Sequence, residues 1–121
     1  MANPSTTGPS GEGTEVLRRV YMYAQSNGSK TVLTVAADHV ATILSLVINN
    51  QVNTTYPMNI HVMPDGGTDQ VILVDGNPLL VAKSTYIWND KIVLTETDVL
   101  RVYSSCTDFD IYCSYIDQEF A

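Results

Sequence analysis

The sequence predicts an all-β fold, a β-sandwich or barrel of about eight or nine short strands. From Val16 onward, apolar residues recur with the period of two that is typical of strands, and almost nowhere with the helical period of 3.6. Residues that favour turns separate these apolar segments at intervals of about eight to twelve residues. No segment has the pattern of a helix. This combination is typical of sandwiches and barrels.

The first fifteen residues differ in composition from the rest of the chain. Pro, Gly, Ser and Thr dominate them and apolar residues show no periodicity, so they cannot bury enough surface to fold alone. We therefore predict an extended arm over 1–15 and one β-sandwich domain over 16–121. Ordering a flexible segment costs about 1–2 kcal/mol per residue, so we expect the arm to become ordered by lying across a partner protein.

Alternation assigns faces to the predicted strands. In the first strand one face has Val16, Arg18, Val20 and Met22, and the other has Leu17, Arg19, Tyr21 and Tyr23. A turn over 26–29 separates it from strands over 31–36 and 40–49. The strand over 40–49 is apolar on both faces, which predicts a central strand. One predicted face has Val40, Leu44, Leu46 and Ile48, and the other has Ala41, Ile43 and Val47.

The second half of the domain continues the pattern. Met58, Ile60 and Val62 are expected to point inward, with Asn59 and His61 outward, before a turn over 64–67. Strands are expected over 70–74, 79–82, 85–88 and 91–94, the last two joined by a tight turn at Asn89-Asp90. Strands over 99–105 and 111–116 would form a closing hairpin, with Leu100 and Val102 in the core. In that hairpin Cys106 faces Cys113, and we expect two buried, reduced thiols; a strained disulfide is the alternative.

The charge balance excludes one class of partner. Six basic residues against thirteen acidic ones give a net charge of −7, which disfavours binding to nucleic acid. No apolar stretch approaches the roughly 20 residues of a membrane span, and no secretory leader is recognisable at the N-terminus. We therefore expect a protein that binds neither membranes nor nucleic acid.

Few residues have the spacing of a chemical site. His39 and His61 have no converging partners and are expected to be solvated surface side chains. No catalytic set, cofactor motif or catalytic metal site is recognisable, so the protein is not expected to be an enzyme. Asp65 and Asp69 in a glycine-rich turn leave open weak calcium binding, although the acidic spacing of a calcium loop is missing.

Two pairs of aromatic residues are candidates for partner contacts. Tyr21 and Tyr23 share one strand face, as do Tyr86 and Trp88. We expect one pair to close the core and the other to lie at a subunit contact, because Tyr and Trp are enriched at interfaces. A platform for sugar binding is the alternative. With the arm included, the candidate contact residues are Asn3, Pro4, Pro9, Tyr21, Tyr23, Tyr86 and Trp88.

Residues 31–115 resemble short virion structural proteins of tailed bacteriophages, including those of cyanophages. The resemblance is carried by TVLTVAADHVATILSLVINN, MNIHVMPDGG, VILVDGNPLLVAKST, KIVLTETDVLRVYSS and IYCSYID. It departs from the family pattern at Thr97, where glycine is common, and at Ala36, where proline is common. The resemblance covers about seventy per cent of the chain and implies a jelly-roll-like sandwich attached to a virion.

The resemblance also implies a function. A head decoration or cement protein would stabilise the capsid through repeated contacts with the major capsid protein or another virion protein, as a homo-oligomer, with a trimer favoured. Its expected location is the virion, assembled in the host cytoplasm. A neck, tail or fibre component is the first alternative, and a module that binds carbohydrate on the host surface is an alternative of another class.

Overall fold

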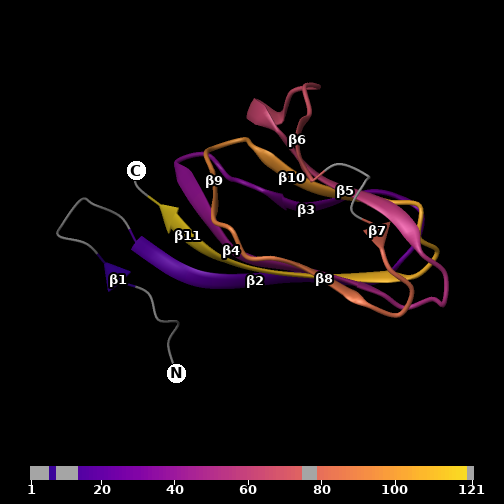
Figure 1. Cartoon of the computed structure of the whole chain (residues 1–121). Coiled ribbons are helices and arrows are strands. Elements are labelled where there is room, and N and C mark those ends of the chain that lie inside the picture. The colour runs from indigo at the N-terminus through magenta and orange to yellow at the C-terminus, as the bar shows by residue number, and fades with distance from the viewer. Residues whose placement is uncertain (1–5, 8–13, 75–78, 120–121) are drawn as a thin grey trace.

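The computed structural model describes residues 6–7, 14–74 and 79–119, which form an antiparallel β-sandwich and confirm the predicted fold class (Figure 1). The only helical element there is the short 3-10 turn η1 (Pro64–Gly66), so nothing in this part is a helix able to cross a membrane. The strands are β1 (Thr6–Thr7), β2 (Thr14–Gln25), β3 (Gly28–Thr34), β4 (His39–Asn50), β5 (Tyr56–Met63), β6 (Val71–Val74), β7 (Leu79–Leu80), β8 (Thr85–Trp88), β9 (Ile92–Leu94), β10 (Val99–Ser104) and β11 (Phe109–Glu119).

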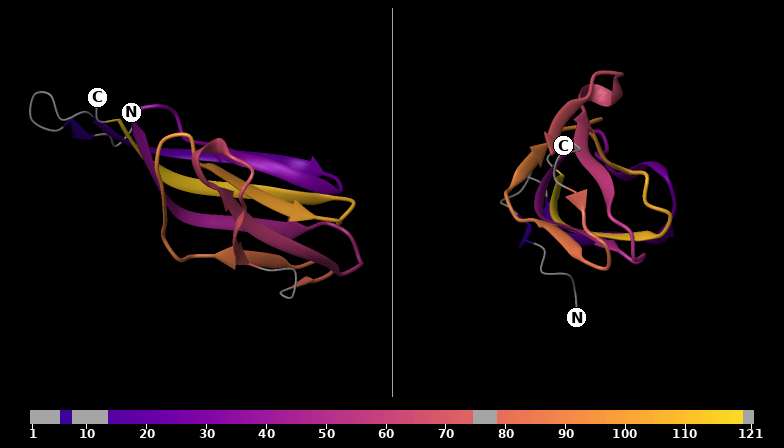
Figure 2. Two further views of the ribbon diagram at one scale, coloured as in Figure 1. Left: turned by 90° about the horizontal axis from the view of Figure 1, so that it is seen from above. Right: turned by 45° about the vertical axis from the view of Figure 1, so that its right-hand side comes forward.

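The strands form two sheets. The six-stranded sheet has the order β1-β2-β11-β4, with β8 and β9 both paired to the far side of β4. The five-stranded sheet has the order β3-β10-β5-β6, with β7 beside β5. Seen from above, β2, β11 and β4 follow one another across the first sheet (Figure 2, left). As predicted, β4 is a central strand.

The core lies between the two sheets. Met58, Ile60, Leu100 and Val102 are fully buried and Val62 is nearly so, which confirms all five predicted core residues. Full burial of such a side chain stabilises the fold by roughly 1.5–3 kcal/mol. Because Met58 and Ile60 are inside, the predicted register of β5 is correct.

The predicted closing hairpin is wrong. β10 pairs with β3 and β5 in one sheet, whereas β11 pairs with β2 and β4 in the other. The connection over residues 105–108 therefore crosses from sheet to sheet instead of making a tight turn. Alternation fixes which residues of each strand face the core, but it does not identify the neighbouring strand.

The predicted faces of β4 are also partly wrong, because the strand contains a bulge. Ser45 pairs with Ser114 and Ile43 with Tyr115, so Leu44 has no partner on β11. An extra residue of this kind reverses the alternation beyond it. The buried face of β4 is accordingly Ala41, Ile43, Leu46, Ile48 and Asn50.

The turn at Asn89-Asp90 does not make a hairpin either. β8 pairs with residues 46–49 of β4, and β9 pairs with residues 41–43 of the same strand. Both run antiparallel to β4, so they are two parts of one edge strand. The interruption between them lies opposite the bulge at Leu44, where a regular ladder cannot continue.

Two turns adopt backbone conformations that favour glycine. Gly66 has φ 65°, and a Cβ there would lie 3.3 Å from the carbonyl oxygen of Thr97. Thr97 itself has φ 69°, an unusual value for a β-branched residue. Its N–H donates to the carbonyl of Val35 at 2.9 Å, while the Val35 N–H donates to the carbonyl of Asp98 at 3.0 Å. These two bonds hold Thr97 in the left-handed region.

Candidate functional site

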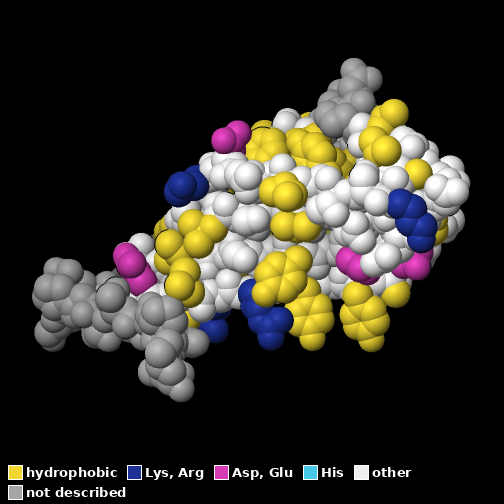
Figure 3. Space-filling model, turned by 60° about the horizontal axis from the view of Figure 1, so that its bottom comes forward, with side chains coloured by type: hydrophobic (Ala, Val, Ile, Leu, Met, Phe, Trp, Pro, Cys, Tyr) yellow, Lys and Arg dark blue, Asp and Glu magenta, His cyan; other side chains and the backbone are white. Residues whose placement is uncertain are grey.

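The outer face of the six-stranded sheet presents two rows of apolar side chains that cross several strands. We call this surface the outer face. Cross-strand pairing places the first row through Tyr21, Tyr112, Val47 and Ile87. Three of these are large hydrophobic residues left exposed: Tyr21 at 55%, Tyr112 at 43% and Ile87 at 55%. Apolar side chains are visible across this face in Figure 3.

The second row lies parallel to the first, with polar side chains between them. It runs through Leu17, Ile116, Thr42 and Val93, and both Leu17 and Val93 are exposed. The polar row between the two consists of Arg19, Ser114 and Ser45. The outer face is therefore apolar on both sides of one central positive charge.

Aromatic contacts orient that charge. The rings of Tyr21 and Tyr112 are stacked, with centroids 6.5 Å apart and planes inclined by 17°. The guanidinium carbon of Arg19 lies 5.3 Å from the centroid of Tyr21, a cation–π distance. Arg19 has no ion-pair partner within residues 14–74 and 79–119, although the chain is strongly acidic.

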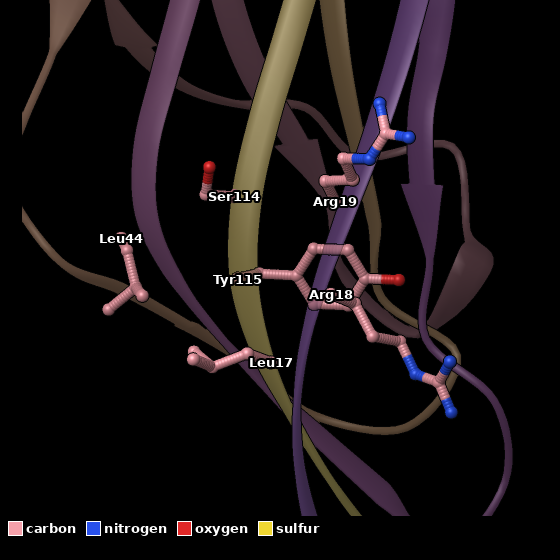
Figure 4. A pocket seen from close by; sticks show the side chains of 6 residues that line it. All are labelled: Leu17, Arg18, Arg19, Leu44, Ser114 and Tyr115. Atoms are coloured by element: carbon pink, nitrogen blue, oxygen red, sulfur yellow. The ribbon is translucent and has the colours of Figure 1, made fainter. Parts of the chain in front are cut away.

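A shallow hollow lies at the centre of the outer face (Figure 4). Its lining residues are Leu17, Arg18, Arg19, Leu44, Ser114 and Tyr115. The bulge in β4 brings Leu44 to this surface. Figure 4 shows both guanidinium groups on the β2 side of the hollow and Leu44 on the β4 side. A partner that fills the hollow would meet apolar carbon and a hydrogen-bond donor together.

Arg18, unlike Arg19, is neutralised within the domain. Its Nε lies 2.9 Å from Asp117 Oδ2, and His39 Nδ1 lies 2.7 Å from Asp117 Oδ1. Burial favours the neutral carboxyl, but the hydrogen bonds from His39 and Arg18 outweigh burial and hold the pKa of Asp117 below its usual value. Arg19 is thus the cation of the outer face that is free to meet an acidic partner.

The predicted contact residues fall into three groups. Tyr21 and Tyr23 are exposed on the outer face, with Tyr23 at 73%. Tyr86 and Trp88 are half-buried against the core, and the indole N–H of Trp88 donates to the Asp90 carbonyl at 2.7 Å. Asn3, Pro4 and Pro9 lie outside the described residues.

The prediction for the two histidines is wrong. His39 is half-buried and ion-paired as described above. His61 is only 2% exposed, although it lies on the face of β5 that points away from the core. In register it sits between Arg101 on β10 and Ile72 on β6, so long neighbouring side chains cover it. Its Nδ1 lies 2.8 Å from Asn59 Oδ1, while its Nε2 has no partner among the described residues.

The cysteines are free and buried, but they do not face each other as predicted. Cys113 is on β11, opposite Val20 and Leu46. Cys106 lies in the crossing between the sheets, where its thiol is 3.3 Å from Asn50 Oδ1. Burial raises the pKa of Cys113 to about 11, so its reactive thiolate is disfavoured.

In the part of the chain that the structure describes, no grouping of acidic, His and Cys side chains suggests a metal centre. Across residues 14–74 and 79–119, three such side chains never come close enough to hold a metal ion. Asp65 and Asp69 are both exposed, and the Asp65 N–H donates to the Asp98 carboxylate at 2.9 Å. The turn at 64–67 is thus held by Asp98.

Most of the outer face cannot be recognised from the sequence. Leu17, Tyr112, Ile87 and Val93 were not singled out, because each is one apolar residue on a different strand. Alternation places Leu17, Tyr21 and Tyr23 on one face of β2, and the structure shows that this face is the exposed one. The alternation within one strand does not give the strand order, and it is the strand order that brings four separate strands together into continuous rows.

Comparisons with known proteins identify the fold. The sequence matches no protein-family model and no curated protein. A subunit of the Bacillus endospore appendages, described as disulfide-linked pili, superposes with a TM-score of 0.58 at 12% identity, covering 96% of this chain and 97% of that one. A chain from the acid-stable capsid of Helicobacter pylori bacteriophage KHP30 gives a TM-score of 0.51 at 10% identity, covering 99% and 95%.

These similarities extend over whole chains, but at such low identity they establish a shared fold alone. The Clostridium perfringens protein CpGH89CBM32-6 is more distant, with a TM-score of 0.47 at 14% identity over 84% of this chain and 76% of that one. That score is too low to support an argument about this chain.

Proposed function

We propose that this chain is a non-enzymatic structural protein of a bacterial virus particle, a decoration or cement protein that docks on the capsid shell. The observation that carries the proposal is the outer face, with its two exposed apolar rows on either side of Arg19. Tyr and Arg are among the side chains that contribute most to protein interfaces. Continuous exposed apolar surface on a folded domain is a mark of such a site.

The expected partner surface is flat and apolar, with one carboxylate opposite Arg19. Arg19 has no carboxylate within the described part of the chain, so we expect the shell protein to supply one above the central hollow. A desolvated ion pair of this kind gives register and specificity to an otherwise apolar contact. Many identical contacts over a shell then add up to a large stabilisation, even when each is weak.

The fold supports the same class of function. Two comparisons that cover whole chains are to a subunit of bacterial appendages and to a chain of a phage capsid, and both are parts of assemblies. The resemblance of residues 31–115 to phage virion proteins favours the capsid over the appendage. A carbohydrate-binding module is less well supported, because Tyr86 and Trp88 are half-buried and do not form an open platform.

Two matched substitutions test the docking surface. Ile87 on the outer face and Ile72 on the other sheet are similarly exposed, at 55% and 50%. We expect Ile87→Asp to weaken co-sedimentation with virus particles at least tenfold, which corresponds to about 1.4 kcal/mol, and Ile72→Asp to have little effect. Equal binding of both variants would exclude the outer face as the docking surface.

Two further measurements separate the alternatives. Density on intact particles distinguishes the head from the neck and tail, since a decoration protein repeats over the whole lattice and a neck component forms a single ring. Binding to a panel of host glycans that Tyr112→Ala abolishes would replace the proposal with a carbohydrate-binding function.

A further inference from the structure

Among the described residues, nothing pairs with the outer edge of β2 over most of its length. β2 pairs with β11 from Thr14 to Gln25, but on its other side only Thr14 and Glu15 have a partner, β1, among the described residues. The backbone N–H and C=O groups that point outward between Val16 and Tyr23 therefore have no strand partner in that part of the chain. Such an edge can accept a strand from another molecule.

The other sheet edges are short or irregular. β6, β8 and β9 have four, four and three residues, and β3 has a register shift where it pairs with β10. Short strands and bulges are the usual protection against unwanted strand pairing. β2 has 12 residues, no proline and regular pairing with β11 from Thr14 to Met22. This edge is therefore neither short nor irregular, unlike the others.

We propose that β2 pairs antiparallel with β2 of a second copy of this chain, about a twofold axis. The register follows from the limits of the open edge. β1 covers Glu15 at one end, and Ala24, with φ 56°, ends the regular strand at the other. Side chains opposite each other in a continuous sheet point to the same face, so one residue of β2 must pair with its own copy, and the twofold axis passes midway between these two copies.

Two registers make full use of this edge. One is centred on Arg19 and pairs residues 16–22, but it places the Arg19 side chains of the two copies directly opposite each other. The other is centred on Val20 and pairs residues 17–23. It sets Arg19 opposite Tyr21 of the second copy and Leu17 opposite Tyr23. Like charges opposite each other are destabilising, whereas Arg–Tyr and apolar pairs are favourable, so the register centred on Val20 is selected.

The sequence of β2 is therefore complementary to itself, which is the argument for a second copy as the occupant. Arg19 already lies over the ring of its own Tyr21, and in the dimer it meets a second tyrosine. Pairing also joins the two outer faces into one surface, so the dimer would dock with two apolar faces at once. The pairing itself does not require the outer face to bind a shell, and it can be tested separately.

Two lysine variants test the edge. Tyr21 and Tyr112 belong to one row and stack on each other, but only Tyr21 is on the edge strand. Tyr21→Lys puts a lysine opposite Arg19 of the second copy, twice per dimer. Tyr112→Lys removes the same Tyr21–Tyr112 stack, but its lysine is on β11 and not on the edge strand. Sedimentation equilibrium should show two chains for the wild type and for Tyr112→Lys, and one chain for Tyr21→Lys. A single chain at every concentration, a three-chain assembly, or the same mass for both variants would overturn the proposal.

Cysteine cross-linking gives an answer that does not depend on the lysine variants folding. In the selected register the two copies of residue 20 face each other, at the Cα spacing that a disulfide needs. Under mild oxidation Val20→Cys should give a two-chain band on a non-reducing gel. The control Met22→Cys lies on the same face of β2, but its two copies would be roughly 14 Å apart along the strands. Cross-linking of Met22→Cys alone, or of neither variant, contradicts this register and the dimer.

The two proposals fail separately. Unchanged particle binding by Ile87→Asp, with the two-chain mass retained, would refute docking through the outer face and leave the dimer intact. A one-chain wild type that still binds particles through the outer face would refute the dimer and leave the docking proposal intact.

Discussion

Cys106 and Asn50 meet where the chain crosses between the two sheets, with the Cys106 thiol 3.3 Å from Asn50 Oδ1. The same oxygen accepts the N–H of Val52 at 2.9 Å. The amide nitrogen of Asn50 donates to the carbonyls of Thr54 at 2.8 Å and Leu80 at 3.1 Å. One side chain, 1% exposed, thus satisfies groups from four other residues. Neutral buried networks of this kind are stabilising only when complete.

Asn50→Asp should destabilise the fold strongly. In the variant, a carboxylate oxygen replaces the amide nitrogen that donates to two carbonyl oxygens, and a charge becomes buried. We therefore expect a loss of about 3 kcal/mol or more in unfolding free energy. Asn49→Asp is the control, because Asn49 is half-buried on the outer face and only accepts a hydrogen bond, from Thr85 Oγ1. Urea denaturation measures both. A similar loss in the two variants would show that the network has no special role.

Thr97→Gly should stabilise the protein. A non-glycine residue in the left-handed region costs about 1–3 kcal/mol, whereas the greater freedom of glycine in the unfolded chain costs about 0.5–1 kcal/mol. The expected net gain is about 1 kcal/mol, seen as a higher melting temperature. Thr107→Gly, in an exposed loop where φ is not positive, should lower it. A drop for Thr97→Gly would mean that its φ of 69° is not strained.

His61 should make stability depend on pH. Burial, together with the nearby charge of Arg101, lowers the pKa of His61 from 6.5. The unfolded chain therefore takes up this proton first as pH falls, and the stability contributed by the neutral ring is lost from pH 6.5 downward until the folded pKa is reached. We expect His61→Gln to show a flatter fall in unfolding free energy between pH 7.5 and about pH 5. An unchanged slope would assign the effect to other groups.

Both thiols should be unreactive in the native protein. Cys106 and Cys113 are buried and free, and the pKa of Cys113 is raised to about 11. A thiol reagent at pH 8 should label neither cysteine until denaturant is added, and then both. A mass deficit of about two daltons in protein unfolded without reductant would show a disulfide instead.

The N-terminal arm should contribute to attachment and not to folding. Within the described residues it meets the domain through two pairs between β1 and the start of β2. Deleting residues 2–13 leaves β2 whole, so the melting temperature should change little while binding to virus particles weakens. Unfolding of the truncated chain would make the arm part of the domain, and full binding would place attachment on the sandwich alone.

The sequence by itself determined which side of β5 and of β10 is buried. Alternation identified Met58, Ile60, Val62, Leu100 and Val102 as core residues, because burial of one face depends on the period of the strand alone. It also identified the turn at 64–67, since the positive φ of Gly66 is a local requirement.

The tertiary structure decided everything that depends on which strands are neighbours. The same alternation fits β11 beside β10 or beside β2 and β4, and only the second arrangement separates Cys106 from Cys113. The bulge at Leu44 reverses the faces of β4, yet one extra residue leaves no mark in the sequence. The outer face itself, with Tyr21, Tyr112, Val47 and Ile87 in one row, is assembled from distant segments. Its rows therefore arise from long-range pairing, whereas the core pattern is local to each strand.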